Sequence, residues 1–319
     1  IINKKLIIQK RRFIKMEELR DLIKSYLLYC DKEKRLSKHT IKAYRIDLSQ
    51  FYSYKRGMSI SKEDLVLYIH YLHENYKPKT IRRKIASLKA FIHYLYYQDV
   101  IPNNPFDKID TSFKEPLLLP RTIPTYLIQR MLSASYEKIK VARTASAKAV
   151  AIRDTSVLEL LFATGARISE ICSLTPENID LDAQIVRIMG KGSKERIIEI
   201  ENYDVLSILK RYYAIYQDDI MSYGYFYLNN RKNRLSEQSV RFMIKGLERE
   251  IGSQIHITPH MFRHSMATML LEEDVDIRYI QRILGHSSIT TTQIYTHVTS
   301  SKQKEILRIK HPRNKIQIK

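Results

Sequence analysis

Apolar residues recur every three or four positions between residues 17 and 97, which is the spacing of amphipathic helices. Breaks in this pattern divide the segment into four helices. The third is expected to begin after Ser61, whose side chain can cap the helix together with Asp64, and the fourth to begin at Pro78. Since each helix has one apolar face, we expect the four to pack together as a single helical domain at residues 16–100.

The helical pattern is lost in the next segment and then gives way to a different period. Five of the nine prolines fall between Pro102 and Pro124, so residues 101–119 are expected to form an extended linker. Apolar residues later alternate in AQIVRIMG and ERIIEI, on either side of a turn at residues 191–194, which predicts a β-hairpin. Helical spacing occurs on both sides of this hairpin, at about residues 126–136, 154–163, 168–174, 205–215, 237–250, 259–272 and 276–284.

These elements predict a chain that is mainly α-helical with a small β-sheet or hairpin, an α+β fold. At 319 residues the chain is long enough for two domains, each with its own core, and a single domain is the less favoured alternative. The second domain is expected at residues 120–305, with a poorly patterned surface insertion at about 133–150. A basic arm at residues 1–15 and a tail at residues 306–319 flank the two domains.

The charge balance suggests a polyanionic partner. The chain has 55 lysines and arginines against 34 acidic residues, a net charge of +21, and nucleic acid is the first candidate for such a partner. The alternative is a basic surface that only aids solubility. The predicted fourth helix has four basic residues off its apolar face, which form either a solvated face or contacts to phosphates: Lys79, Arg82, Arg83 and Lys89.

Two cysteines, Cys30 and Cys172, lie far apart in the sequence, so neither a disulfide framework nor a cysteine zinc site is supported. Such cysteine usage fits a reducing compartment, and we expect the cytoplasm. No apolar run approaches the roughly 18 residues of a membrane span, so a membrane partner is not expected.

Glycine is scarce in this chain, yet four of its eight glycines lie in three short stretches, ATGARISE, GKGSKER and LGHSS. Glycines at such places suggest backbone that turns sharply or approaches a ligand closely. Each stretch has a basic or imidazole side chain within two residues of its glycine, namely Arg167, Lys191 and His286. A fourth stretch, TPHMFRHS, begins a helix that places His260 and Arg263 on one face.

Together with Tyr295, these side chains suit chemistry at a phosphodiester. Guanidinium groups bind the non-bridging oxygens, imidazoles move protons, and a hydroxyl can attack phosphorus. His260 and His264 also have the spacing of a helical zinc pair. We do not expect a metal, because HMFRH lacks the glutamate that follows the first histidine in hydrolytic zinc helices and Arg263 would repel a cation.

The stretches TGARISEICSLTPENID, GKGSKERIIEI and TPHMFRHSMATMLLEEDVDIRYIQRILGHSSITTTQIYTHV resemble the tyrosine recombinases, in the Xer-like branch of the phage integrase family. The resemblance covers roughly residues 17–305. It implies a SAM-like core-binding domain and a catalytic domain that close as a clamp around duplex DNA, with Lys194 added to the four basic residues above as candidate DNA contacts. It also implies a tetramer, of this chain or with a related recombinase, on two specific core sites, a monomer or dimer without DNA, and no metal, ATP or other cofactor.

The resemblance further implies a role for each residue of the catalytic signature. Arg167 and Arg263 would stabilise the scissile phosphate, while Lys191 would protonate the leaving 5′ oxygen. His260 would accept the proton of the tyrosine, and His286 would hydrogen-bond the phosphate.

Tyr295 would then attack phosphorus to give a 3′-phosphotyrosyl intermediate. Glu170 matches an acidic position that orients the site, although a surface carboxylate is an open alternative. Residues 299–309 would dock on a neighbouring subunit, or equally fold back on their own domain. Two other functions compete with recombination: a type IB topoisomerase-like enzyme, which the compact core-binding domain argues against, and a DNA-binding relative without catalysis, which the complete signature argues against.

Overall fold

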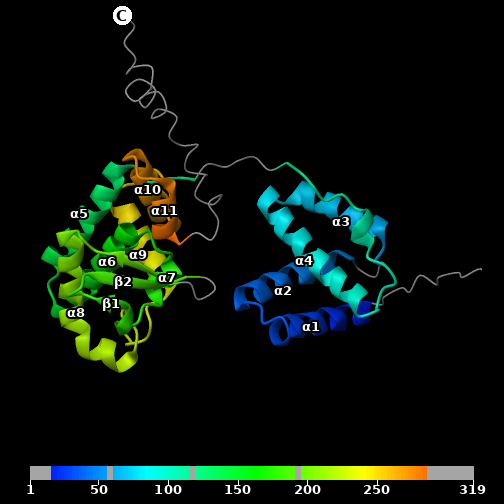
Figure 1. Cartoon of the computed structure of the whole chain (residues 1–319), viewed down its shortest axis with the longest axis horizontal. Helices are drawn as coiled ribbons and strands as arrows, with labels where there is room; N and C mark the ends of the chain where they lie inside the picture. Colours follow the sequence, from blue (N-terminus) through cyan, green and yellow to red (C-terminus); the bar gives the residue numbers. More distant parts are fainter. Residues whose placement is uncertain (1–15, 56–59, 115–119, 191–194, 286–319) are drawn as a thin grey trace, which may run out of the picture. The chain divides into compact units, whose positions relative to one another are not determined.

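The structure is a computed structural model, and it describes residues 16–55, 60–114, 120–190 and 195–285 (Figure 1). The chain divides into two compact units, with the boundary between Leu117 and Leu118. Each unit has its own hydrophobic core. No helix in the described ranges is long and apolar enough to cross a membrane.

The first unit contains the four predicted helices. Ser61 caps the third as expected: its hydroxyl accepts a hydrogen bond from the backbone N–H of Asp64, and the Asp64 carboxylate accepts one from the backbone N–H of Ser61. Ile60 packs against the same core as Leu65, where it can act as a hydrophobic staple. The helices are α1 (Met16–Lys32), α2 (Lys38–Lys55), α3 (Lys62–Asn75) and α4 (Pro78–Tyr97).

The segment after α4 differs from the extended linker that its prolines suggested. A short 3-10 helix, η1 (Pro105–Lys108), is capped by Asn104, and Ile101 and Phe106 are buried in the core of the first unit. Phe113 also packs against this core. Because these apolar side chains are spaced irregularly between prolines, they carry no period, yet they hold residues 101–113 against the helices of the first unit.

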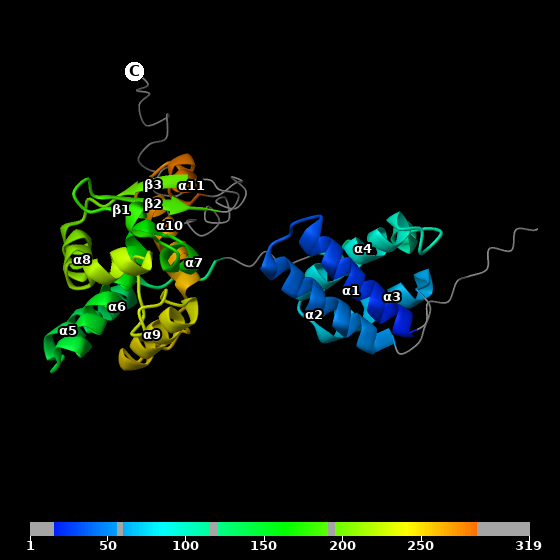
Figure 2. The ribbon, with the colours of Figure 1, turned by 90° about the horizontal axis from the view of Figure 1, so that it is seen from below.

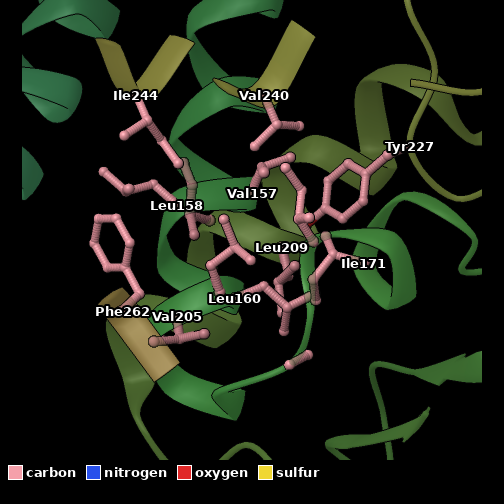
Figure 3. Packing of buried hydrophobic residues seen from close by; sticks show 14 of the residues in the cluster. Val157, Leu158, Leu160, Ile171, Val205, Leu209, Tyr227, Val240, Ile244 and Phe262 are labelled. Carbon is pink, nitrogen blue, oxygen red and sulfur yellow. The ribbon is translucent and has the colours of Figure 1, made fainter. Parts of the chain in front are cut away.

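The second unit surrounds helix α6, whose buried residues point in several directions. Figure 3 shows Val157, Leu158 and Leu160 of α6 among buried side chains from the neighbouring helices, all in one hydrophobic cluster. A helix that is apolar on all sides is typical of a core position. The elements in chain order are α5 (Thr125–Val141), α6 (Ala145–Thr164), α7 (Ile168–Cys172), η2 (Pro176–Asn178), β1 (Ile179–Asp180), β2 (Ile185–Met189), β3 (Glu195–Glu199), α8 (Tyr203–Tyr223), α9 (Glu237–Glu250), α10 (Pro259–Glu272) and α11 (Ile277–Leu284).

The sheet confirms the predicted hairpin strands and adds one strand to them. β1, β2 and β3 are antiparallel in that order, with Val186 opposite Ile198 and Ile188 opposite Arg196. Figure 2 shows the three strands side by side, with α11 next to them. The expected turn at residues 191–194 lies outside the described residues. The fold is therefore mainly α-helical with a small sheet, as predicted.

The surface insertion expected near residues 133–150 is wrong. α5 continues to Val141 and buries Ser135 and Ile139, and α6 begins at Ala145, with the Thr144 hydroxyl accepting a hydrogen bond from the backbone of Ala147. The first turns of α6 are rich in alanine, which favours helix without giving an apolar period. Only a three-residue turn, 142–144, separates the two helices.

Candidate functional site

The chain turns sharply at Gly165, where α6 ends in the left-handed backbone region with φ +56°. Two residues later Arg167 caps α7. A Cβ atom on Gly165 would lie 2.6 Å from Sδ of Met266 and 2.9 Å from Cδ2 of Leu284, so α10 and the end of α11 pack directly on this turn. The glycine therefore allows three segments that are distant in the sequence to meet beside Arg167.

Arg263 joins these three segments by hydrogen bonds. Its side chain lies on α10 and is only 3% exposed. Nη1 donates to the backbone carbonyl of Gly165 at 2.7 Å, and Nη2 donates to the carbonyl of Leu284 at 2.6 Å. One guanidinium thus fixes the turn before Arg167 to the last residue of α11, and charge-assisted bonds of this kind are among the strongest in proteins.

Glu170 is buried between two arginines. Its carboxylate accepts hydrogen bonds from Nη1 of Arg167 at 2.7 Å and from Nη2 of Arg196 at 2.7 Å, and it also accepts the backbone N–H of Arg167. Burial alone would raise the pKa of Glu170, but the hydrogen bonds from Arg196 and Arg167 outweigh it and lower that pKa. The alternative of a surface carboxylate is wrong, because Glu170 is 7% exposed.

Arg167 remains accessible despite its ion pair, since 36% of its side chain is exposed. His260, in the first turn of α10, is exposed as well. Partial burial, followed by the positive charges of Arg263 and Arg167, lowers the pKa of His260. Its imidazole is therefore uncharged at neutral pH and able to accept a proton.

The structure brings four of the predicted site residues together: Arg167, Glu170, His260 and Arg263. Lys191, Lys194, His286 and Tyr295 lie outside the described residues. For Lys191, Lys194 and His286, the neighbouring residue in the sequence is described. β2 ends shortly before residues 191–194 and β3 begins directly after them. α11 ends at Gly285, which has a left-handed backbone conformation and directly precedes position 286.

His264 lies one turn after His260 and is partly buried. Burial, followed by the nearby His260 and Arg263, lowers the pKa of His264 to about 4. Within the described ranges, no group of three or more histidine, cysteine, aspartate or glutamate side chains has an arrangement that could hold a metal ion.

The four basic candidates in the first unit all lie on α4 and are exposed. Arg83 forms an ion pair with the buried Asp47 of α2. Asp47 also accepts hydrogen bonds from Lys84 and Ser87, both of which are buried where α4 packs on α2. This network fixes the rotation of α4 on α2, and with it the direction in which the basic residues project.

Two of these basic residues also contact the segment after η1. Lys89 donates a hydrogen bond to the hydroxyl of Thr111 at 2.6 Å, and the guanidinium of Arg82 lies 5.8 Å from the ring centre of Phe113. A pocket between α4 and residues 109–113 is lined by both basic side chains. Residues 109–113 therefore lie along one edge of the basic face of α4.

Sequence reasoning missed two charged residues that organise these surfaces, Asp47 and Arg196. A signal for Arg196 was present in the pattern of β3. Alternation places Arg196 on the same face as Ile198 and Ile200, so a charged residue stands at an inward position, and such a residue requires a buried partner.

Two regions of the chain match models of known protein families. Residues 129–302 match the phage integrase family, and residues 23–99 match the N-terminal SAM-like domain of phage integrases. A tyrosine recombinase of Agathobacter rectalis is 52% identical over 301 residues, covering 93% of this chain and 98% of the relative. The tyrosine recombinase XerD of Listeria monocytogenes is 34% identical, over 92% of this chain and 100% of the relative.

Solved structures also share the fold. The XerH recombinase bound to a palindromic difH substrate matches with a TM-score of 0.73 and 20% sequence identity, over 92% of this chain and 84% of that one.

Proposed function

This chain belongs to the phage integrase family and is a site-specific tyrosine recombinase, and we propose that the cluster around Arg263 is its DNA-cleavage site. The observation that carries the proposal is the pair of hydrogen bonds from Arg263 to the carbonyls of Gly165 and Leu284. They hold the segment with Arg167, the first turn of α10 with His260, and the chain leading to residue 286 in one place.

We propose that Arg167 and Arg263 neutralise the scissile phosphate as charge builds up on its oxygens. The partial exposure of Arg167 supports a direct contact, because a guanidinium that still faces solvent can exchange water for phosphate oxygens. His260 accepts the proton of the attacking tyrosine, and its lowered pKa keeps the imidazole uncharged and available for this role. His286 donates a hydrogen bond to the phosphate.

The nucleophile in this proposal is Tyr295. Its phenolate oxygen attacks phosphorus, a 3′-phosphotyrosyl bond forms, and the bond to the 5′ oxygen breaks as Lys191 gives that oxygen a proton. The intermediate is then attacked by the 5′ hydroxyl of a second strand, which reverses the same steps. The bonds broken and formed are of the same kind, so neither ATP nor a metal ion is required.

We further propose that the helical unit at residues 16–100 is the core-binding domain, that residues 120–305 form the catalytic domain, and that both hold the same DNA. The net charge of +21 supports a duplex partner contacted on many phosphates. The palindromic DNA in the XerH complex supports a two-fold site, and hence a tetramer that joins two such sites. Two free buried thiols, Cys30 and Cys172, fit a cytoplasmic protein.

A nicked suicide substrate that loses its 5′ hydroxyl fragment on cleavage tests the chemistry. The wild-type chain should accumulate a covalent protein–DNA adduct, with or without EDTA, and Tyr295→Phe should form none. Tyr279→Phe is the matched control, because Tyr279 is an exposed tyrosine of α11 and its loss of one hydroxyl should leave the adduct unchanged.

A normal adduct from Tyr295→Phe, or loss of the adduct in EDTA, would refute the proposed mechanism. Relaxation of supercoiled plasmids that lack a core site would instead favour the topoisomerase-like alternative.

A further inference from the structure

Arg196 is a buried arginine in a strand of the second unit, and its side chain is only 9% exposed. It forms a fork with the carboxylate of Glu170: Nη2 lies 2.7 Å from Oε2, and Nη1 lies 3.3 Å from Oε1. The same two oxygens bind Arg167, through its Nη1 and its backbone N–H. Arg196 is therefore linked to the exposed guanidinium of Arg167 through one shared carboxylate.

The charges of this group explain why a second arginine is needed. If Glu170 and Arg167 were alone, they would form a neutral pair, and the carboxylate would compete with a DNA phosphate for the same guanidinium. With Arg196 present, two cations share one anion, so the group keeps one positive charge in excess. Because Arg196 is buried and Arg167 is 36% exposed, that excess is presented to solvent at Arg167.

Arg196 also lies against Gly285, at the end of α11. Gly285 has φ +66°, and a Cβ atom there would lie 3.0 Å from Nη1 and 3.1 Å from Cδ of Arg196. The backbone at Gly285 therefore passes close to the Arg196 guanidinium, and together with its positive φ this close approach favours a residue without a side chain. Among the described residues, Nε of Arg196 is buried without a hydrogen-bond partner, which carries a desolvation cost.

We propose that Arg196 is a positioning residue for DNA cleavage: it binds the Glu170 carboxylate and so leaves the charge of Arg167 available to the scissile phosphate. This proposal rests on the role of Arg167 proposed above. Arg196 itself does not touch the DNA. Its effect is on the rate of cleavage and not on the affinity for DNA, since affinity is spread over many other phosphate contacts.

The test compares Arg196→Met with the wild type in single-turnover cleavage at saturating DNA, alongside DNA affinity and thermal unfolding. Arg196→Met should cleave about 10- to 100-fold more slowly, as expected when a catalytic group loses its orientation or charge. Its affinity for DNA should stay within about twofold, following the many shared contacts. The conservative Arg196→Lys keeps the charge but not the fork, and should fall between the two rates.

A double substitution separates this electrostatic role from a structural one. In Arg196→Met with Glu170→Gln, the carboxylate that masks Arg167 is neutral, so cleavage should be faster than in Arg196→Met alone. A merely structural role predicts the opposite, because a second partner in the core has been removed.

The proposal is overturned if Arg196→Met cleaves at the wild-type rate, if it loses affinity in proportion to rate, or if Glu170→Gln slows it further. Should Arg196→Met fail to fold, a wild-type rate for Arg196→Lys overturns the proposal in its place. If the wild type itself forms no covalent adduct, the proposed cleavage site fails, and this role for Arg196 fails with it.

Discussion

Adding one methyl group at Gly165 tests whether α10 and α11 pack on the turn before Arg167. Gly165→Ala places a Cβ in the left-handed region, which costs a residue with a side chain about 1–2 kcal/mol. The methyl also meets Sδ of Met266 at 2.6 Å and Cδ2 of Leu284 at 2.9 Å. Met266 is half-buried and can rotate aside, whereas Leu284 is fully buried, so overpacking adds about 1–3 kcal/mol.

Gly224→Ala is the matched control, because Gly224 also ends a helix with φ +71° but has no atom within 4 Å of the added methyl. It should cost only the backbone penalty. Urea unfolding followed by circular dichroism should therefore give a free energy of unfolding about 1–3 kcal/mol lower for Gly165→Ala than for Gly224→Ala. Equal losses in the two variants would refute the packing of α10 and α11 on this turn.

Three further changes test other parts of the structure. The folded chain holds the pKa of His264 at about 4, so the free energy of unfolding should decline as the pH falls from about 6.5 towards 4. His264→Gln should make the urea midpoint less dependent on pH over that range, and an unchanged pH dependence would contradict this. Asp47→Asn leaves Lys84 buried without its carboxylate and should lower the free energy of unfolding of the first unit by about 3–5 kcal/mol, and a loss under about 1 kcal/mol would show that the network is dispensable. Lys79→Ala should reduce the slope of log affinity against log salt concentration by about 1. The control Lys24→Ala, which removes the lysine of an exposed ion pair on α1, should leave this slope unchanged. Equal slopes for the two variants would show that Lys79 of α4 does not contact DNA phosphates.

The sequence predicted those elements whose apolar residues keep a period. The four helices of the first unit, the cap at Ser61 and the hairpin strands were all confirmed. Two segments were missed because local spacing carries no signal for them. Residues 133–141 and 145–150 are helical through tertiary burial and alanine content, and residues 101–113 are held by a few apolar side chains between prolines.

For the candidate site, the residue types were evident from the sequence but their partners were not. Glu170 could be assigned to the interior only once its α7 carboxylate was seen to bind Arg196 of β3, 26 residues further along the chain. Similarly, nothing in the spacing of TPHMFRHS shows that Arg263 binds the carbonyls of Gly165 and Leu284. Contacts between charged groups and distant backbone are set by the fold as a whole, and they carry no local pattern.

The two arginines of the proposed cleavage site differ in what a mutation can reveal. Arg263 is 3% exposed and holds two backbone carbonyls, so replacing it removes bonds that fold the site together with any contact to phosphate. Arg167 is 36% exposed, and its side chain binds a carboxylate that Arg196 also holds. Loss of stability and loss of cleavage should therefore coincide at Arg263 and separate at Arg167. The burial of Arg263 also places its charge where water screens it little. The same buried position that lets Arg263 bind the two carbonyls therefore strengthens its electrostatic attraction for a phosphate.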